Sequence, residues 1–140
     1  CTQNFVAGML GQESGGLDDT VKFLERNTAG IKGRSRRLMD VLDAHGIHYL
    51  HGEAGLFLWM DLRSYLPAPD PKASNQADDY DRRERELYLL LMKEFGLLFT
   101  PGRSMRMAVP GFFRCVFTAA DEKEYDLALG RFDKFLTSTK

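Results

Sequence analysis

Hydrophobic residues recur at steps of three and four residues through most of the first third of the chain. This spacing predicts a helix over Thr2–Leu10 and a second, much longer helix over Leu17–His45. Steps of this kind keep one face of a helix turned toward a single surface. Gly46 is suited to end the long helix in the left-handed conformation. Gly30 and Gly33 lie inside the long helix, so we expect a kink, a break or tight packing there.

Four short extended segments are predicted among the helices. Residues 47–50 form a short strand, and Leu56–Leu62 is almost wholly apolar, as expected of a strand that is covered on both faces. The turn-like residues 52–55 between them favour a hairpin. Farther along the chain, residues 97–100 predict a short strand and residues 112–118 predict a clear one.

The stretch Ser64–Asp81 differs in kind from its neighbours, because it combines prolines with Ser, Asn, Gln and Asp. We expect an exposed, mobile loop there. Helical spacing returns over Arg82–Phe95, and a closing helix begins where Asp121 and Glu124 stand at capping-box spacing. Strands and helices are mixed without strict alternation. This order favours an α+β fold, with a small, mostly antiparallel sheet and helices packed on it.

Composition narrows the class of protein. The chain has 140 residues and a net charge of −1, with 44% hydrophobic and 28% charged residues, so a single domain over residues 1–140 is expected. The near-neutral charge makes nucleic acid a poor partner, and no apolar run approaches the length of a membrane span. Two cysteines build neither a disulfide framework nor a closed zinc site, which fits a reducing, cytoplasmic setting. The chain begins without Met, which suggests a fragment, although a processed or engineered start would look the same.

One charged residue in the apolar segment 112–118 needs an explanation. Alternation along a strand places Arg114 on a face with aromatic and aliphatic neighbours. A guanidinium in such surroundings is partly desolvated, which is costly unless an anion pairs with it. That anion is either internal, for example Asp61 or Glu53, or it is the carboxylate of a ligand, which accepts two parallel hydrogen bonds from the planar guanidinium. Alternatively, the side chain reaches water at the sheet surface. The pattern alone favours these internal and solvent explanations over a ligand.

The remaining candidate residues are weaker. Trp59 in an apolar strand is more typical of a core residue than of a stacking platform, and Cys115 between aromatic residues indicates a small buried hydrophobe. His48 and His51 would point to opposite faces of a regular strand, so they cannot hold one metal ion together. The sequence contains no nucleophile elbow and no phosphate-binding glycine loop. It therefore offers no self-contained catalytic set.

Three blocks of sequence, taken in order, carry a resemblance to a known family. The blocks are GLFLWMDL at 55–62, TPGRS at 100–104 and PGFFRCVF at 110–117. They resemble the C-terminal part of fold type I pyridoxal-phosphate enzymes, and the nearest group is the 1-aminocyclopropane-1-carboxylate synthases and the class I and II aminotransferases. The similarity covers nearly the whole chain except residues 64–81. The two Pro-Gly pairs bracket a connection of the kind found at the rim of a site.

The resemblance implies that this chain is the C-terminal small domain that closes over a cofactor held by a larger domain of the same polypeptide. It also implies that Arg114 binds the α-carboxylate of an amino-acid substrate. With the resemblance included, a ligand carboxylate is favoured over the internal and solvent explanations for Arg114. The chain departs from the family at Arg103, where the family commonly has a small residue. The parent is then a cytoplasmic pyridoxal-phosphate aminotransferase or lyase, and it is expected to be a homodimer.

The cofactor lysine of the family has no counterpart in this chain. The family binds pyridoxal phosphate through a lysine in a Ser-x-Ser-Lys setting, and no lysine here stands in such a setting. The lysines are Lys22, Lys32, Lys72, Lys93, Lys123, Lys134 and Lys140. The resemblance therefore implies that pyridoxal phosphate belongs to the full-length parent, and that the fragment alone binds no cofactor and is inactive. The alternative is a free-standing α+β module for ligand binding or oligomerisation, without catalysis.

Overall fold

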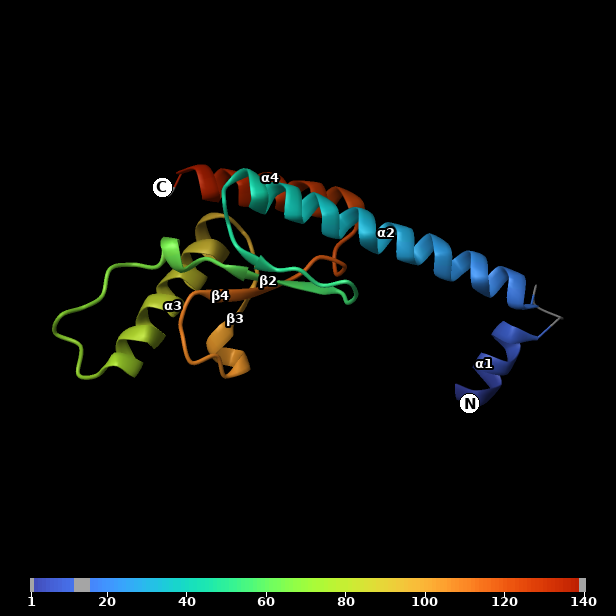
Figure 1. Ribbon diagram of the computed structural model, residues 1–140, viewed down its shortest axis with the longest axis horizontal. Helices are drawn as coiled ribbons and strands as arrows, with labels where there is room; N and C mark the ends of the chain where they lie inside the picture. Colours follow the sequence, from blue (N-terminus) through green and yellow to red (C-terminus); the bar gives the residue numbers. More distant parts are fainter. Residues whose placement is uncertain (1, 12–15, 139–140) are drawn as a thin grey trace. The chain divides into compact units, whose positions relative to one another are not determined.

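The computed structural model describes residues 2–11 and 16–138 of the chain (Figure 1). Contacts between residues divide the chain into two compact units, residues 1–34 and residues 35–140. The described residues of the first unit are almost entirely helical, whereas the second unit contains a sheet and the candidate site. Among the described helices, none combines the length and the apolar character that crossing a membrane requires.

The two predicted N-terminal helices are confirmed. They are α1 (Thr2–Leu10) and α2 (Gly16–Ala44), and Gly46 follows α2 in the left-handed conformation with a φ of 67°. Helix α2 continues through Gly30 and Gly33 without interruption, and a Cβ atom at either glycine would meet no atom within 4 Å. The expected break and tight packing are therefore wrong. Glycine costs a helix only up to ~1 kcal/mol relative to alanine, which a long helix can tolerate.

The second unit is built on a small antiparallel sheet in the order β1-β2-β4-β3. Its strands are β1 (Tyr49–Leu50), β2 (Phe57–Asp61), β3 (Thr100–Pro101) and β4 (Phe112–Val116). The strands at the two edges are shorter than predicted. Strand β4 lies between β2 and β3, so it has hydrogen-bonded neighbours on both sides. The predicted α+β fold with a small antiparallel sheet is confirmed.

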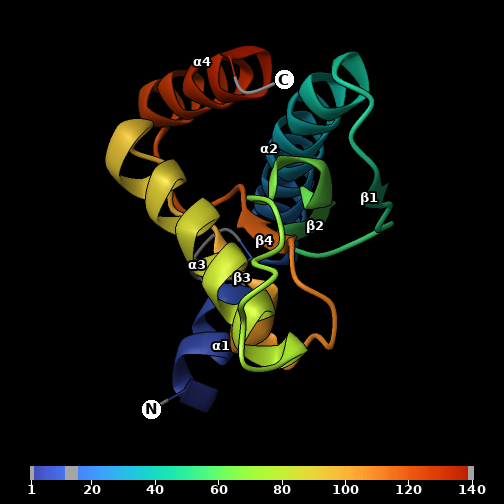
Figure 2. The same ribbon diagram turned by 90° about the vertical axis from the view of Figure 1, so that its left-hand side faces the viewer.

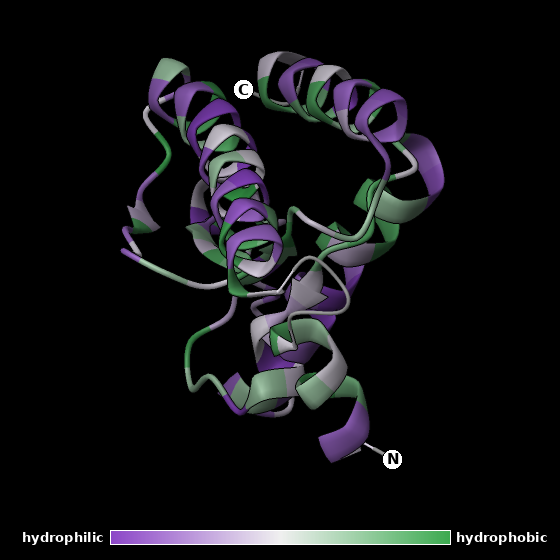
Figure 3. Cartoon of the chain, turned by 90° about the vertical axis from the view of Figure 1, so that its right-hand side faces the viewer, coloured by the Kyte–Doolittle hydropathy of each residue, from purple (hydrophilic) through white to green (hydrophobic). Residues whose placement is uncertain are grey.

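Helices cover one face of this sheet and form the core with it. Helix α4 (Glu122–Ser138) and the end of α2 lie over the same side of the sheet in Figure 1, and Figure 2 shows α3 (Gln76–Glu94) beside the β3 edge. Leu58, Met60 and Phe113 are buried on the covered face of the sheet. The helices add buried side chains, which are Leu38, Leu42, Leu87, Leu91, Phe132, Phe135 and Leu136. Figure 3 shows hydrophilic and hydrophobic bands along α2 and α4, as expected of helices with one face in a core.

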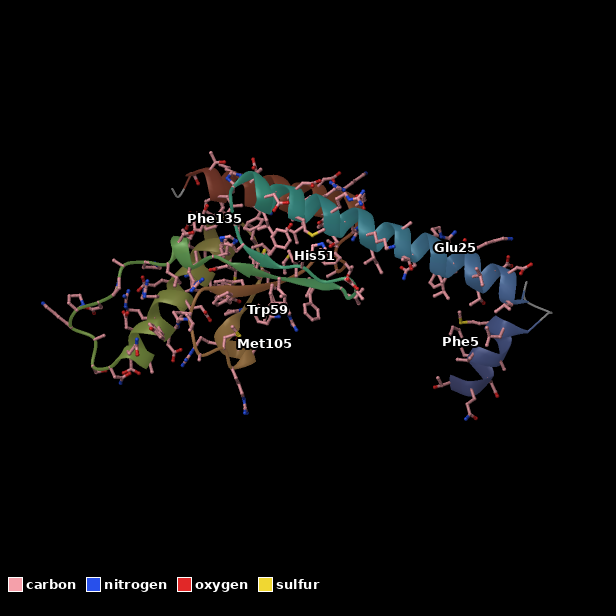
Figure 4. The ribbon with its side chains drawn as sticks, in the orientation of Figure 1. Phe5, Glu25, His51, Trp59, Met105 and Phe135 are labelled. Carbon is pink, nitrogen blue, oxygen red and sulfur yellow. The ribbon has the colours of Figure 1, made fainter. Side chains whose placement is uncertain are left out.

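The opposite face of β2 is not buried. Burial alternates along the strand, so that Leu58 is 4% exposed, Phe57 is 47% exposed and Trp59 is half-buried. Figure 4 shows Trp59 on the side of the sheet away from Phe135. The expectations of a strand covered on both faces and of Trp59 in the core are therefore wrong. An antiparallel sheet can keep one open face, and here that face is apolar.

Helix α3 begins at Gln76, well before the predicted start at Arg82. The Asn75 side chain caps it by accepting a 2.9 Å hydrogen bond from the backbone N–H of Asp78. The expected loop over residues 64–81 is therefore too long at its C-terminal end. At its other end, the expected loop overlaps the short helix η2 (Arg63–Tyr65), whose Tyr65 side chain is buried. Asn75 lies inside a stretch rich in loop-forming residues, so the local composition favours a loop over the start of a helix.

The capping box predicted for the last helix is present. The Asp121 carboxylate accepts a 2.9 Å hydrogen bond from the Glu124 N–H, and the Glu124 carboxylate accepts a 3.1 Å bond from the Asp121 N–H. Arg37 of α2 forms ion pairs with Glu122 and Asp126 at the beginning of α4. These contacts fix the two helices side by side over the sheet.

Candidate functional site

Arg114 lies in the middle of the sheet face that turns away from α2 and α4. The register places Trp59 of β2 and Thr100 of β3 directly opposite Arg114, one on each side. Directly opposite residues in antiparallel strands share a face of the sheet. We define the open face by Phe57, Trp59, Thr100, Arg114 and Val116, which are all half-buried or exposed. The central strand thus presents a guanidinium between an indole and a hydroxyl group.

The Arg114 guanidinium is poorly satisfied by its own chain. Its Nη2 atom donates one long hydrogen bond of 3.4 Å to the Thr100 hydroxyl, and its Nε atom is buried without a hydrogen-bond partner. The guanidinium carbon lies 5.4 Å from the centre of the Phe57 ring, which is a cation–π distance. No carboxylate within residues 2–11 and 16–138 forms an ion pair with Arg114. The Arg114 guanidinium is therefore partly shielded from water and has no anionic partner among the described residues.

The two internal partners predicted for Arg114 do not reach it. The Asp61 carboxylate instead accepts hydrogen bonds of 2.6 Å and 2.9 Å from the side chain of Arg63. The hydrogen bond from the Arg63 side chain holds the pKa of Asp61 below its ordinary value. Glu53 is exposed in the turn before β2. An internal ion pair is therefore not observed, which leaves the carboxylate of a ligand and water at the sheet surface as the two remaining explanations.

The segment between β3 and β4 borders the open face and has a glycine at each end. Helix η3 (Gly102–Met105) follows β3, and a Cβ atom at Gly102 would lie 2.8 Å from the Phe112 carbonyl oxygen. Gly111 has a φ of 94°, which strains any other residue. Figure 4 shows Met105 of this segment and Trp59 on the same side of the sheet. Both Pro-Gly turns thus require their glycine, and both lie next to the strands that carry the site.

Glu84 is absent from the residues predicted as functional, yet it is a buried carboxylate at this segment. It extends from α3, is 2% exposed, and accepts hydrogen bonds from the backbone N–H groups of Arg103 at 2.9 Å and Gly111 at 2.7 Å. The Arg103 guanidinium itself pairs with Asp81 on the same helix. A signal was present in the sequence, because Glu84 stands at helical spacing from the core residue Leu87. A carboxylate on an apolar stripe indicates a buried polar contact.

The other candidate residues do not form a second site. Cys115 is buried as predicted, and burial raises its pKa to about 12, so the thiol is protonated at neutral pH. The Nε2 atom of His45 lies 2.8 Å from the Asp133 carboxylate, which links the turn after α2 to α4. The described residues contain no group of three His, Cys, Asp or Glu side chains that could hold a metal ion.

Comparison with protein families agrees with the resemblance seen in the sequence blocks. Residues 1–132 match the family described as aminotransferase class I and II. The chain belongs to this family. Members of the family are pyridoxal-phosphate-dependent enzymes that act on amino acids. The resemblance predicted from the three sequence blocks is confirmed.

Relatives within the family include several 1-aminocyclopropane-1-carboxylate synthases. The 1-aminocyclopropane-1-carboxylate synthase 1 of Cucurbita pepo is 35% identical over 135 residues, which cover 96% of this chain and 24% of the relative. The 1-aminocyclopropane-1-carboxylate synthase 5 of Arabidopsis thaliana is 35% identical over 120 residues, which cover 86% of this chain and 23% of the relative. The chain therefore spans about a quarter of the length of these relatives.

Solved structures of aminotransferases share the fold of the chain. An aromatic aminotransferase from Pyrococcus horikoshii superposes with a TM-score of 0.65 at 15% identity, over 85% of this chain and 28% of that protein. An aminotransferase from Mycobacterium tuberculosis superposes with a TM-score of 0.61 at 19% identity, over 81% of this chain and 26% of that protein. These similarities support the α+β assignment of the fold.

Proposed function

We propose that this chain is the substrate-binding small domain of a larger pyridoxal-phosphate-dependent enzyme, an aminotransferase or a 1-aminocyclopropane-1-carboxylate synthase-like lyase. Arg114 binds the α-carboxylate of the amino-acid substrate. The observation that carries this proposal is the state of the guanidinium, whose Nε is buried without a partner and whose Nη2 makes only a 3.4 Å bond to a hydroxyl. Membership of the family supports the reaction class, and the match to about a quarter of each relative supports the role of a part.

A carboxylate supplies what the Arg114 guanidinium lacks. Its two oxygens can accept parallel hydrogen bonds from the planar guanidinium, an arrangement that a lysine ammonium cannot provide. The ring of Phe57 lies against the guanidinium and excludes water from one side, which strengthens the attraction between the opposite charges. Because β4 is held by β2 and β3, the backbone that carries Arg114 is fixed before the substrate arrives. Binding of the substrate therefore costs little conformational entropy of the protein.

The described lysines do not fit the role of cofactor attachment. All of them are exposed, and they lie on helices or in a loop rather than on the open face. They are Lys22, Lys32, Lys72, Lys93, Lys123 and Lys134. Pyridoxal phosphate, when bound to an enzyme, supplies an electron sink for the reacting amino acid. We propose that the larger domain holds this cofactor, whereas the present chain orients the substrate by binding the substrate carboxylate.

Replacing Arg114 in the full-length enzyme tests the proposal. Removing one partner of a desolvated charge pair costs roughly 2–5 kcal/mol, so Arg114→Ala should raise KM for the amino acid about 30-fold or more. Arg114→Lys keeps the charge without the planar fork, and it should recover only part of the loss. Arg85→Ala, at an exposed position on α3, is the matched control and should leave KM unchanged.

Two results would oppose the proposal. If Arg114→Ala has the KM and kcat of the unaltered enzyme, Arg114 does not bind the substrate. If the native polypeptide, sized by mass spectrometry of the endogenous protein, ends close to residues 1 and 140, the larger domain is missing and a free-standing module is the better explanation.

A further inference from the structure

We infer that Glu84 is a positioning residue for the substrate-carboxylate site at Arg114, because the buried Glu84 carboxylate accepts hydrogen bonds from both ends of the segment between β3 and β4. These hydrogen bonds set the position of Thr100 relative to Arg114. The inference rests on the proposed function of Arg114 and adds to it a residue that touches neither the substrate nor the guanidinium. Its basis is a pair of hydrogen bonds from one carboxylate to two distant peptide groups.

The two hydrogen bonds of Glu84 bracket the segment symmetrically. One oxygen accepts the Arg103 N–H at 2.9 Å, and the other oxygen accepts the Gly111 N–H at 2.7 Å. Thr100 lies three residues before Arg103, and Arg114 lies three residues after Gly111. Glu84 therefore anchors residues 100–103, which carry the Thr100 hydroxyl, and residues 111–114, which carry the Arg114 guanidinium.

The anchor at Gly111 extends to a third element. The Gly111 carbonyl accepts a 2.8 Å hydrogen bond from the Leu62 N–H, at the end of β2. The peptide groups on either side of Gly111 are thus held by α3 through Glu84 and by the residue that follows β2. Because Gly111 directly precedes β4, a shift at this point moves the beginning of the strand that carries Arg114.

The chemistry of the contact requires a carboxylate. Glu84 takes part in no ion pair among the described residues, and its two oxygens are satisfied by backbone N–H donors. A glutamine at this position has nearly the same shape but only one oxygen. Its NH₂ group would face one of the two N–H groups, so that one buried donor would lose its acceptor. Glu84→Gln therefore releases one end of the segment with little change in side-chain volume.

The experiment compares two ligands in the full-length enzyme, the amino-acid substrate and the matching amine that lacks the α-carboxylate. The ratio of their dissociation constants measures the preference for a carboxylate. We expect Arg114→Ala to abolish this preference and Glu84→Gln to reduce it about tenfold, with faster hydrogen exchange of the amides in residues 102–113. Glu86→Gln, at an exposed position two residues later on the same helix, should leave the preference and the exchange unchanged.

The outcomes separate the inference from the proposed function. If Arg114→Ala keeps the preference, the proposed function fails. If Arg114→Ala abolishes the preference while Glu84→Gln keeps it and accelerates exchange, Glu84 supports the fold only and the inference is overturned. Should Glu84→Gln fail to fold, Glu84→Asp carries the same test, because it retains the charge but shortens the reach. A reduced preference in Glu84→Asp then supports the inference, and an unchanged preference overturns it.

Discussion

Replacing Gly111 with alanine is expected to destabilise the second unit by about 2–5 kcal/mol. The backbone of Gly111 has a φ of 94°, and a side chain in a conformation of this kind costs about 1–2 kcal/mol. The added Cβ atom would lie 2.8 Å from Cγ and 3.0 Å from Cα of Arg63, and 3.0 Å from the Leu66 side chain. Arg63 Cα belongs to the backbone and cannot move aside alone, so overpacking adds about 1–3 kcal/mol.

Urea denaturation followed by circular dichroism measures this effect, with Gly130→Ala as the control. Gly130 lies inside α4, and a Cβ atom there would meet nothing within 4 Å, so the same substitution should stabilise the helix by up to ~1 kcal/mol. The two variants are therefore expected to move the unfolding midpoint in opposite directions. The reasoning is refuted if Gly111→Ala unfolds at the same urea concentration as the unaltered protein, or at a higher one.

Two further predictions concern the ionisable groups of the sheet. In a Cys1→Ser variant, the Cys115 thiol, with its pKa raised to about 12 by burial, should react with a thiol reagent at pH 8 only after unfolding; rapid reaction of the folded protein would contradict this. The hydrogen bond from the Arg63 side chain lowers the pKa of Asp61 in the folded protein. This hydrogen bond therefore stabilises the fold at pH values above the pKa of the unfolded carboxyl. The stabilisation is lost as the pH falls through the lower pKa of the folded state. Asp61→Asn should therefore lower the unfolding free energy at pH 7 and lower it less at a pH acidic enough to protonate the folded Asp61 carboxyl, and an equal cost at both pH values would argue against the ion pair.

Local signals predicted much of the fold. The stripe over residues 17–45 and the Gly46 stop predicted α2, and the spacing of Asp121 and Glu124 predicted the cap of α4, because these features depend on neighbours in the sequence. The start of α3 was missed, since Asn75 serves as a cap only once the chain after it is helical. The open face of β2 was also missed. Composition cannot distinguish an apolar strand inside a core from one whose outer face stays apolar for another purpose.

For the candidate site too, local signals predicted one part, and contacts between distant segments determine the other. Alternation along the strand placed Arg114 among apolar neighbours and raised the question of its anion. The register that brings Thr100 and Trp59 to either side of Arg114 depends on pairing between distant segments, which the sequence does not display. Glu84 contacts peptide groups, which carry no residue identity, so no pair of side chains in the sequence could have indicated its partners.

The alternation of faces along β4 limits how this chain can change during evolution. Arg114 faces outward and Cys115 faces the core, so inserting or deleting one residue in the strand would exchange them, burying the guanidinium and exposing the thiol. Residues 66–75 lie outside the sheet and outside any helix, so a change of length there does not alter the alternation of faces along β4. Homologous proteins should therefore differ in length in that loop and keep a constant number of residues from Gly111 to Val116.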